Sequence, residues 1–172
     1  MQSIFNAIGT AVDAVARALF VVGGVLLSAM MLIITADVVT RTLFGISGGA
    51  IRVVVAGGVE LVRFTLLFSI LCTLPAVVER GQVVVESFTT RMPQHIKQLL
   101  FAVYLLGFCA FGAMLAYGWY GSGMGALDYD EVTQDLAIPM APLYFAAAAC
   151  AAVLSVRSLI CAFRAFAGKV TA

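Results

Sequence analysis

Three long runs without a charged side chain decide what this 172-residue chain can fold into. They cover residues 18–36, 98–127 and 136–156. A helix needs about 20 predominantly apolar residues to cross a hydrocarbon core of about 30 Å, and each run is close to that length or longer. The runs therefore predict membrane-spanning helices rather than the buried helices of a soluble domain.

A fourth apolar stretch, residues 53–78, carries two charges, Glu60 and Arg63. Its charge-free part, residues 64–78, would reach only about 22 Å at helical rise, so this helix must hold both charges at or inside the membrane. We predict an all-α integral membrane protein with four transmembrane helices and one membrane domain, residues 1–172. The approximate spans are 18–36, 53–78, 98–120 and 136–156.

Composition excludes several classes of protein. The chain is 63% apolar and 11% charged, with a mean hydropathy of +1.08, which is far from the balance of a soluble domain. A net charge of +1 with few Lys/Arg clusters predicts no nucleic-acid partner. Residues 1–17 lack the basic n-region of a secretory signal, and the first apolar run exceeds the usual h-region of about 7 to 15 residues. We expect the first helix to be retained.

The basic residues predict the orientation. Four spans place both termini and the loop 79–97 on one side, which carries seven basic residues: Arg17, Arg80, Arg91, Lys97, Arg157, Arg164 and Lys169. The other side carries Arg41 and Arg52, and also Arg63 if it reaches the interface. Because cytoplasmic loops are enriched in Lys and Arg, both termini are predicted to be cytoplasmic. Amphipathic patterns also predict short interfacial helices at residues 4–17 and 84–92.

Four charges near the predicted outer surface are candidate contact residues. Asp37 and Arg41 are four residues apart and Glu60 and Arg63 three apart, so each pair shares a helix face and can form an ion pair. Charges at membrane depth are costly unless they are paired or snorkel, which makes them functional candidates. They could contact another membrane subunit, anchor the helices at headgroup level, or serve the transport of a solute. Direct transport is disfavoured because the last two spans carry no ionisable groups at depth.

An acidic loop follows the third span on the predicted outer side. It holds four carboxylates: Asp128, Asp130, Glu131 and Asp135. Either this loop is ordinary solvated surface, or it is a docking surface for a soluble protein in the periplasm.

The cysteines test a redox function. Cys72, Cys109 and Cys150 lie within spans and Cys161 lies at the inner end, with no CxxC motif and no cysteine in an outer loop. This distribution favours cysteine as a small packing residue. No histidine lies in a span to bind haem, and we expect no catalytic residue, cofactor or metal. Two small-xxx-small pairs, Gly24 with Ser28 and Gly112 with Ala116, predict close helix packing.

Four short motifs carry a family resemblance. They are Asp37-Val38-Val39-Thr40-Arg41-Thr42-Leu43-Phe44-Gly45, Glu60-Leu61, Glu79-Arg80-Gly81 and Thr133-Gln134-Asp135-Leu136-Ala137-Ile138-Pro139. In this order they resemble the small membrane subunit of tripartite ATP-independent periplasmic (TRAP) transporters, over about residues 15–160. One departure is visible, because family members often place a histidine after the loop glycine, where this chain has Gln82.

The resemblance implies a non-enzymatic transport component of the bacterial inner membrane. Its implied partners are a large membrane subunit, a periplasmic substrate-binding protein and membrane lipids, in the sodium-coupled uptake of an organic acid. Two alternatives stay open: an autonomous small transporter or channel, and a membrane thiol or quinone oxidoreductase. Unbroken apolar helices argue against a carrier, which usually needs interrupted helices or midplane polar groups, and the cysteine positions argue against the oxidoreductase.

Overall fold

The computed structural model describes residues 2–48, 57–78 and 93–166, and almost all of these residues are helical. Four helices follow one another: α1 (Gln2–Ile46), α2 (Gly58–Val77), α4 (Gln94–Asp128) and α5 (Met140–Phe166). All four are long and apolar enough to cross a membrane. The predicted all-α membrane fold with four spans is therefore confirmed, while the cytoplasmic placement of the termini stays a prediction.

The first helix is longer than its predicted span. At about 1.5 Å per residue, the 45 residues of α1 exceed a hydrocarbon core of about 30 Å. Residues 4–17 are helical, but they are continuous with the span and do not form the separate interfacial helix that the sequence suggested. No proline interrupts the segment, so nothing in the backbone ends the first helix there. The second predicted interfacial helix, residues 84–92, lies outside the described residues.

Two helices begin later than the apolar pattern suggested. α2 begins at Gly58, after Gly57 in a left-handed conformation with φ 67°; residues 53–56 lie outside the described part. α5 begins at Met140, and the residues from Leu136 to Pro139 belong to the preceding loop. Ala137 has a φ of 51°, which a right-handed helix cannot contain. Hydropathy alone does not reveal this turn, because its residues are apolar.

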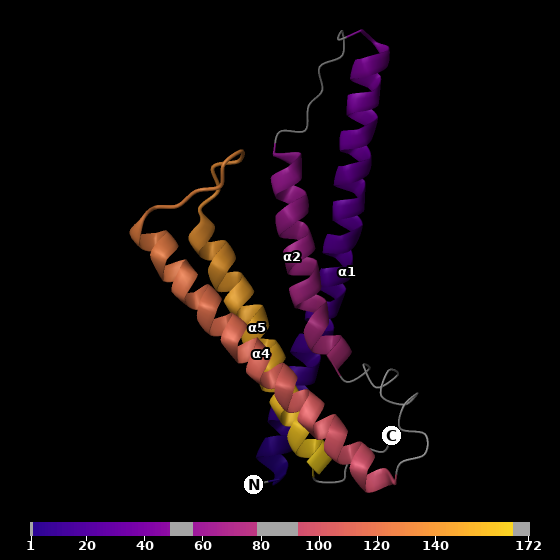
Figure 1. The fold of residues 1–172 in the computed structure, drawn as a ribbon, viewed down its shortest axis with the longest axis vertical. Coiled ribbons are helices and arrows are strands. Elements are labelled where there is room, and N and C mark those ends of the chain that lie inside the picture. The colour runs from indigo at the N-terminus through magenta and orange to yellow at the C-terminus, as the bar shows by residue number, and fades with distance from the viewer. Residues whose placement is uncertain (1, 49–56, 79–92, 167–172) are drawn as a thin grey trace.

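The helices pack as two antiparallel pairs. Figure 1 shows α1 beside α2 and α4 beside α5, and α5 also contacts both α1 and α2. The pairs lie close together near the N-terminus of α1 and diverge towards the end that carries the loop between α4 and α5 (Figure 1). A buried apolar cluster lies between α2, α4 and α5, and contains Val78, Phe101, Ala102, Leu105, Leu154, Cys161, Ala162 and Ala165.

Small residues set the close contacts within each pair. A Cβ atom added to Gly112 would lie 2.9 Å from the backbone nitrogen of Ser155, so α4 and α5 touch through their backbones there. The predicted packing role of Gly112 is confirmed. Gly24 makes no close contact within this chain, because nothing lies within 4 Å of its added Cβ; Gly23 is the contact residue, against Ser69 and Thr73 of α2. Ser69 also donates a hydrogen bond to the carbonyl of Gly23, at 2.9 Å.

Much of the first helix is uncovered. Only 6% of the most apolar window of α1 is buried inside the chain. Its large exposed side chains include Val21, Val25, Met31, Leu32 and Ile46. In a membrane this surface faces lipid or another subunit, so α1 contributes one narrow face to the fold and leaves the rest available.

Candidate functional site

The first polar cluster joins α2 to the loop between α4 and α5. Both carboxylate oxygens of Glu60 accept backbone N–H groups of that loop: from Gln134 at 3.0 Å, Asp135 at 3.3 Å and Leu136 at 3.0 Å. Three consecutive amides facing one carboxylate form a favourable, charge-assisted arrangement. We call this cluster the Glu60 latch. It brings together two of the sequence motifs on which the family resemblance rests.

The loop that receives Glu60 is folded tightly on itself. Thr133 is 4% exposed; its N–H donates to the carbonyl of Ile138 at 2.9 Å, and its hydroxyl accepts the Ile138 N–H at 3.1 Å. Val132 and Pro139 form an isolated antiparallel bridge. The loop also packs on the start of α2, because the side chain of Leu136 fills the space above Gly57 and would lie 2.6 Å from an added Cβ. A glycine is needed here both for its positive φ and for this approach.

The structure confirms one of the two predicted ion pairs. Nε of Arg41 lies 2.9 Å from Oδ2 of Asp37, with the arginine side chain 72% exposed. The predicted pairing of Glu60 with Arg63 is wrong, because the Glu60 carboxylate turns to the three amides of the loop. Arg63 is exposed, and its guanidinium carbon lies 6.0 Å from the ring centre of Phe64. Three hydrogen bonds to a carboxylate outweigh one solvent-screened pair.

Four acidic residues lie at the end of α4 and in the loop that binds Glu60. Asp128 ends α4, and Asp130, Glu131 and Asp135 follow it in the loop; all four are exposed. Asp130 has a φ of 47°, a left-handed conformation that aspartate tolerates better than most residues. These exposed carboxylates give the loop a negative surface. A docking function for this surface stays a prediction.

The second polar cluster lies near the opposite end of the helices and joins α1, α2 and α5. Oδ1 of Asp13 lies 3.2 Å from Nε of Arg157, and its Oδ2 lies 3.3 Å from Nη1 of Arg164. Arg157 is buried, and its Nη1 also donates to the backbone carbonyl of Pro75 in the last turn of α2. A guanidinium at this position donates to a carbonyl that has no partner within the helix, and its positive charge is favourable at the negative, C-terminal end of the helix dipole. We call this cluster the Asp13 cluster.

Sequence reasoning did not find the Asp13 cluster. Arg157 and Arg164 served only to predict orientation, and Asp13 fell in the predicted interfacial segment. A signal was present, because the two arginines are seven residues apart and so lie on one face of α5. The partner on α1 is 144 residues from Arg157, and no local spacing rule reaches that far.

The cysteines lie at helix contacts. Sγ of Cys72 on α2 lies 3.8 Å from Sγ of Cys150 on α5, and Cys109 on α4 contacts the hydroxyl of Ser155. All four cysteines are free thiols. In the described ranges, no three His, Cys, Asp or Glu residues are grouped so that they could hold a metal ion. These positions are those of packing residues between helices.

A model of a known protein family matches most of the chain. The model of the family described as tripartite ATP-independent periplasmic transporters, DctQ component, matches residues 30–168. The matched region includes the Glu60 latch, the acidic loop and both arginines of the Asp13 cluster, and it leaves out Asp13 itself. Neither a curated protein nor a solved structure matches the chain.

Proposed function

This chain belongs to the DctQ family, the small membrane component of tripartite ATP-independent periplasmic transporters, and from this membership we propose a scaffold role for it. It is a multi-pass inner-membrane component of a transporter and not an enzyme. The proposed role is to hold the large membrane subunit while that subunit takes up an organic acid with sodium. A periplasmic binding protein delivers the acid.

One observation carries this proposal: the carboxylates of Glu60 and Asp13 each bind groups on another element and so join the helices. Glu60 binds loop amides, and Asp13 binds two arginines. A carrier needs convergent polar groups at the membrane midplane or interrupted helices. Between these two clusters, the described helices meet through thiols and hydroxyls as well as apolar side chains, and the hydroxyls of Ser69 and Ser155 donate to backbone carbonyls of neighbouring helices. This arrangement supports a structural role within one membrane domain.

The exposed charges suggest where partners bind. Arg63 is exposed at the start of α2, where a carboxylate of the large subunit could reach it. The exposed apolar surface of α1 provides a much larger area for helix packing in lipid. On the opposite side of α2, the ordered acidic loop would meet a binding protein if the basic residues face the cytoplasm, as their distribution predicts.

The alternatives receive less support. A thiol or quinone oxidoreductase would need cysteine pairs accessible from the oxidising side, whereas Cys72 and Cys150 meet between two helices. An autonomous channel would need a polar path along the bundle. The small residues of α5, including Ala147, Ala148 and Ala151, are buried instead.

Reconstitution in liposomes tests the proposed function. Vesicles holding only this chain, with a sodium gradient and a saturating mixture of binding protein and candidate carboxylates, should show no uptake above empty vesicles. Vesicles holding this chain together with its large subunit should take up the substrate. The matched control is the large subunit alone, which should be less active or less stable. Sodium-driven uptake by this chain alone would overturn the scaffold role.

A further inference from the structure

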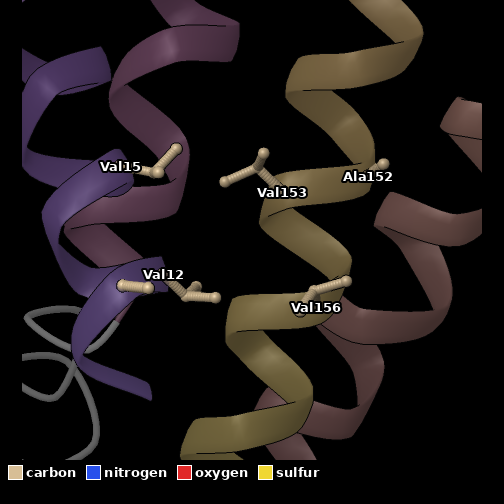
Figure 2. Close-up of a pocket in the computed structure, with 6 residues that line it drawn as sticks. Val12, Val15, Ala152, Val153 and Val156 are labelled. Atoms are coloured by element: carbon tan, nitrogen blue, oxygen red, sulfur yellow. The ribbon is translucent and has the colours of Figure 1, made fainter. Parts of the chain in front are cut away.

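An apolar groove runs between α1 and α5 beside the Asp13 cluster. It has a volume of about 280 Å³ and is lined by Ala11, Val12, Val15, Ala152, Val153 and Val156. Figure 2 shows the two walls, with Val12 and Val15 on α1 and Val153 on α5 across the gap. Every lining side chain is aliphatic, so the groove can hold a hydrocarbon chain but offers nothing to a polar solute.

The groove ends at a positive charge. Val12 and Val156 are directly followed in the sequence by Asp13 and Arg157, which pair with each other. Two guanidinium groups, those of Arg157 and Arg164, share the single carboxylate of Asp13, so the cluster has an excess of positive charge. A third arginine, Arg17, donates from Nε to the backbone carbonyl of Asp13 at 3.4 Å.

Arg164 is the arginine best placed to bind a further anion. Its side chain is 29% exposed, and the Asp13 contact uses only Nη1. Gly9 leaves room for the guanidinium, because a Cβ added there would lie 2.1 Å from Nη2. α1 and α5 run antiparallel here, so Arg164 lies level with Gly9, further towards the helix ends than the groove residues. This order, an apolar groove and then a cation towards the surface, matches a lipid with its headgroup at the membrane interface.

We propose that this groove and Arg164 form a binding site for one anionic phospholipid. An acyl chain lies in the groove, and the phosphate accepts hydrogen bonds from the Arg164 guanidinium. Arginine is well suited to this contact, because its planar donors match phosphate oxygens, and basic pockets between membrane helices recognise anionic headgroups. An acyl chain is thin enough for the space, whereas a further helix is about 10 Å across. The site does not depend on the proposed transport role.

Native mass spectrometry of the full chain in a neutral detergent tests the site. Phosphatidylglycerol and phosphatidylcholine of the same chain length are titrated separately, and the retained lipid is counted. The wild-type chain should retain phosphatidylglycerol in preference to phosphatidylcholine. Arg164→Gln should lower that preference about fivefold, the effect expected of one arginine near an anionic headgroup. Arg63→Gln, which removes an exposed arginine from the other end of the bundle, should leave it unchanged.

A second substitution tests the contribution of the groove separately from that of the Arg164 guanidinium. Ala152→Trp fills the groove from its exposed wall and should reduce retention of both lipids, with the preference unchanged. Ala36→Trp, at an exposed position on α1, is its matched control and should have no effect. The melting temperature in phosphatidylcholine checks that each variant is folded, since Asp13 keeps Arg157 as a partner in Arg164→Gln.

Three results would overturn the proposal. Equal retention of the two lipids by the wild-type chain would show that no anionic headgroup is recognised. Unchanged retention in Ala152→Trp would show that no acyl chain lies in the groove. The third result comes from competition with inorganic phosphate at millimolar concentration. If it displaces phosphatidylglycerol completely, with the same potency in the wild type and in Ala152→Trp, the arginine is an anion site without an acyl-chain groove.

Discussion

Two aspartates of α1 form ion pairs in different surroundings. Asp37 pairs with Arg41 on the same helix, and the arginine is largely exposed. Asp13 pairs across helices with Arg157, whose side chain is 9% exposed. An exposed pair four residues apart on a helix contributes about 0.3 to 0.5 kcal/mol. A buried arginine that loses its partner costs far more, because its charge is left without compensation in the interior.

Asp13→Asn should therefore destabilise the chain much more than Asp37→Asn. We expect a loss of about 3 kcal/mol or more for Asp13→Asn and of about 0.5 kcal/mol or less for Asp37→Asn. Thermal or denaturant unfolding of the purified chain in detergent measures both. Equal, small losses would show that Arg157 reaches water or lipid headgroups without Asp13.

Glu60→Gln should loosen the loop between α4 and α5 without unfolding the helices. The amide keeps one oxygen acceptor but turns an NH₂ donor towards the backbone donors of Gln134, Asp135 and Leu136. After allowance for partial exposure, the loss is about 1 to 2 kcal/mol, which raises local opening by about five- to thirtyfold. Hydrogen exchange at Gln134 and Leu136 should accelerate by that factor. Glu131→Gln, which removes an exposed carboxylate from the same loop, should not change it.

At the scale of helices, the sequence predicted that each helix exists better than it predicted where the helix begins or which groups its side chains contact. Three charge-free runs and one apolar stretch with two charges located the four helices, because crossing a bilayer imposes one length and one polarity on each. The start of α5 was not predictable from hydropathy, since Leu136 to Pro139 are as apolar as a helix. Contacts with Glu60, Thr133 and Val132 hold them in the loop. Spacing suggested Arg63 as the partner of Glu60. The true partners are backbone amides, which have no signature in the sequence.

Gly112 sets the approach of α4 to α5, and its replacement tests that contact. A methyl group at Gly112 would meet backbone atoms of Ala151 and Ser155, which can give way only if the helices separate. Gly107, on the same helix, has nothing within 4 Å. Gly107→Ala should therefore be neutral or stabilise by up to about 1 kcal/mol, since alanine favours the helix. Gly112→Ala should destabilise by about 1 to 3 kcal/mol, the usual cost of overpacking.

Both variants are measured by the same unfolding assay. Comparing Gly107→Ala with Gly112→Ala controls for helix propensity, because both replace glycine by alanine within α4. Equal stabilisation by the two substitutions would mean that α4 and α5 are not in backbone contact at Gly112.

At the scale of the whole molecule, two polar clusters join the helix pairs at opposite ends. The Asp13 cluster joins α5 to α1 and α2 at the end where the pairs lie close, and the Glu60 latch spans the end where they diverge (Figure 1). Between these ends the described helices meet through apolar side chains, thiols and hydroxyls, including the hydrogen bond from Ser69 to the carbonyl of Gly23. Fixing both ends gives α1 and α2 a defined angle to α4 and α5, as a scaffold for a larger subunit requires.

The acidic loop provides the last prediction, which concerns the assembled transporter. Asp128, Asp130 and Glu131 are exposed on the surface that the Glu60 latch orders. Charges of one sign on such a surface mainly change the rate of encounter with a partner. Replacing them by Asn, Asn and Gln should raise the binding-protein concentration needed for half-maximal uptake by about three- to tenfold. Maximal uptake should be unchanged, since the loop's backbone contacts remain.

Salt and a charge-conserving variant make this test specific. Interactions between exposed charges are screened over about 8 Å at physiological ionic strength, so raised salt should shrink the difference between the neutralised variant and the wild type. The double substitution Asp128→Glu with Glu131→Asp keeps the charge and should behave as the wild type. Asn at position 130 tolerates the left-handed backbone there, so the neutralised loop keeps its fold. An unchanged dependence on binding-protein concentration would mean that the loop is solvated surface, and that the binding protein docks on the large subunit alone.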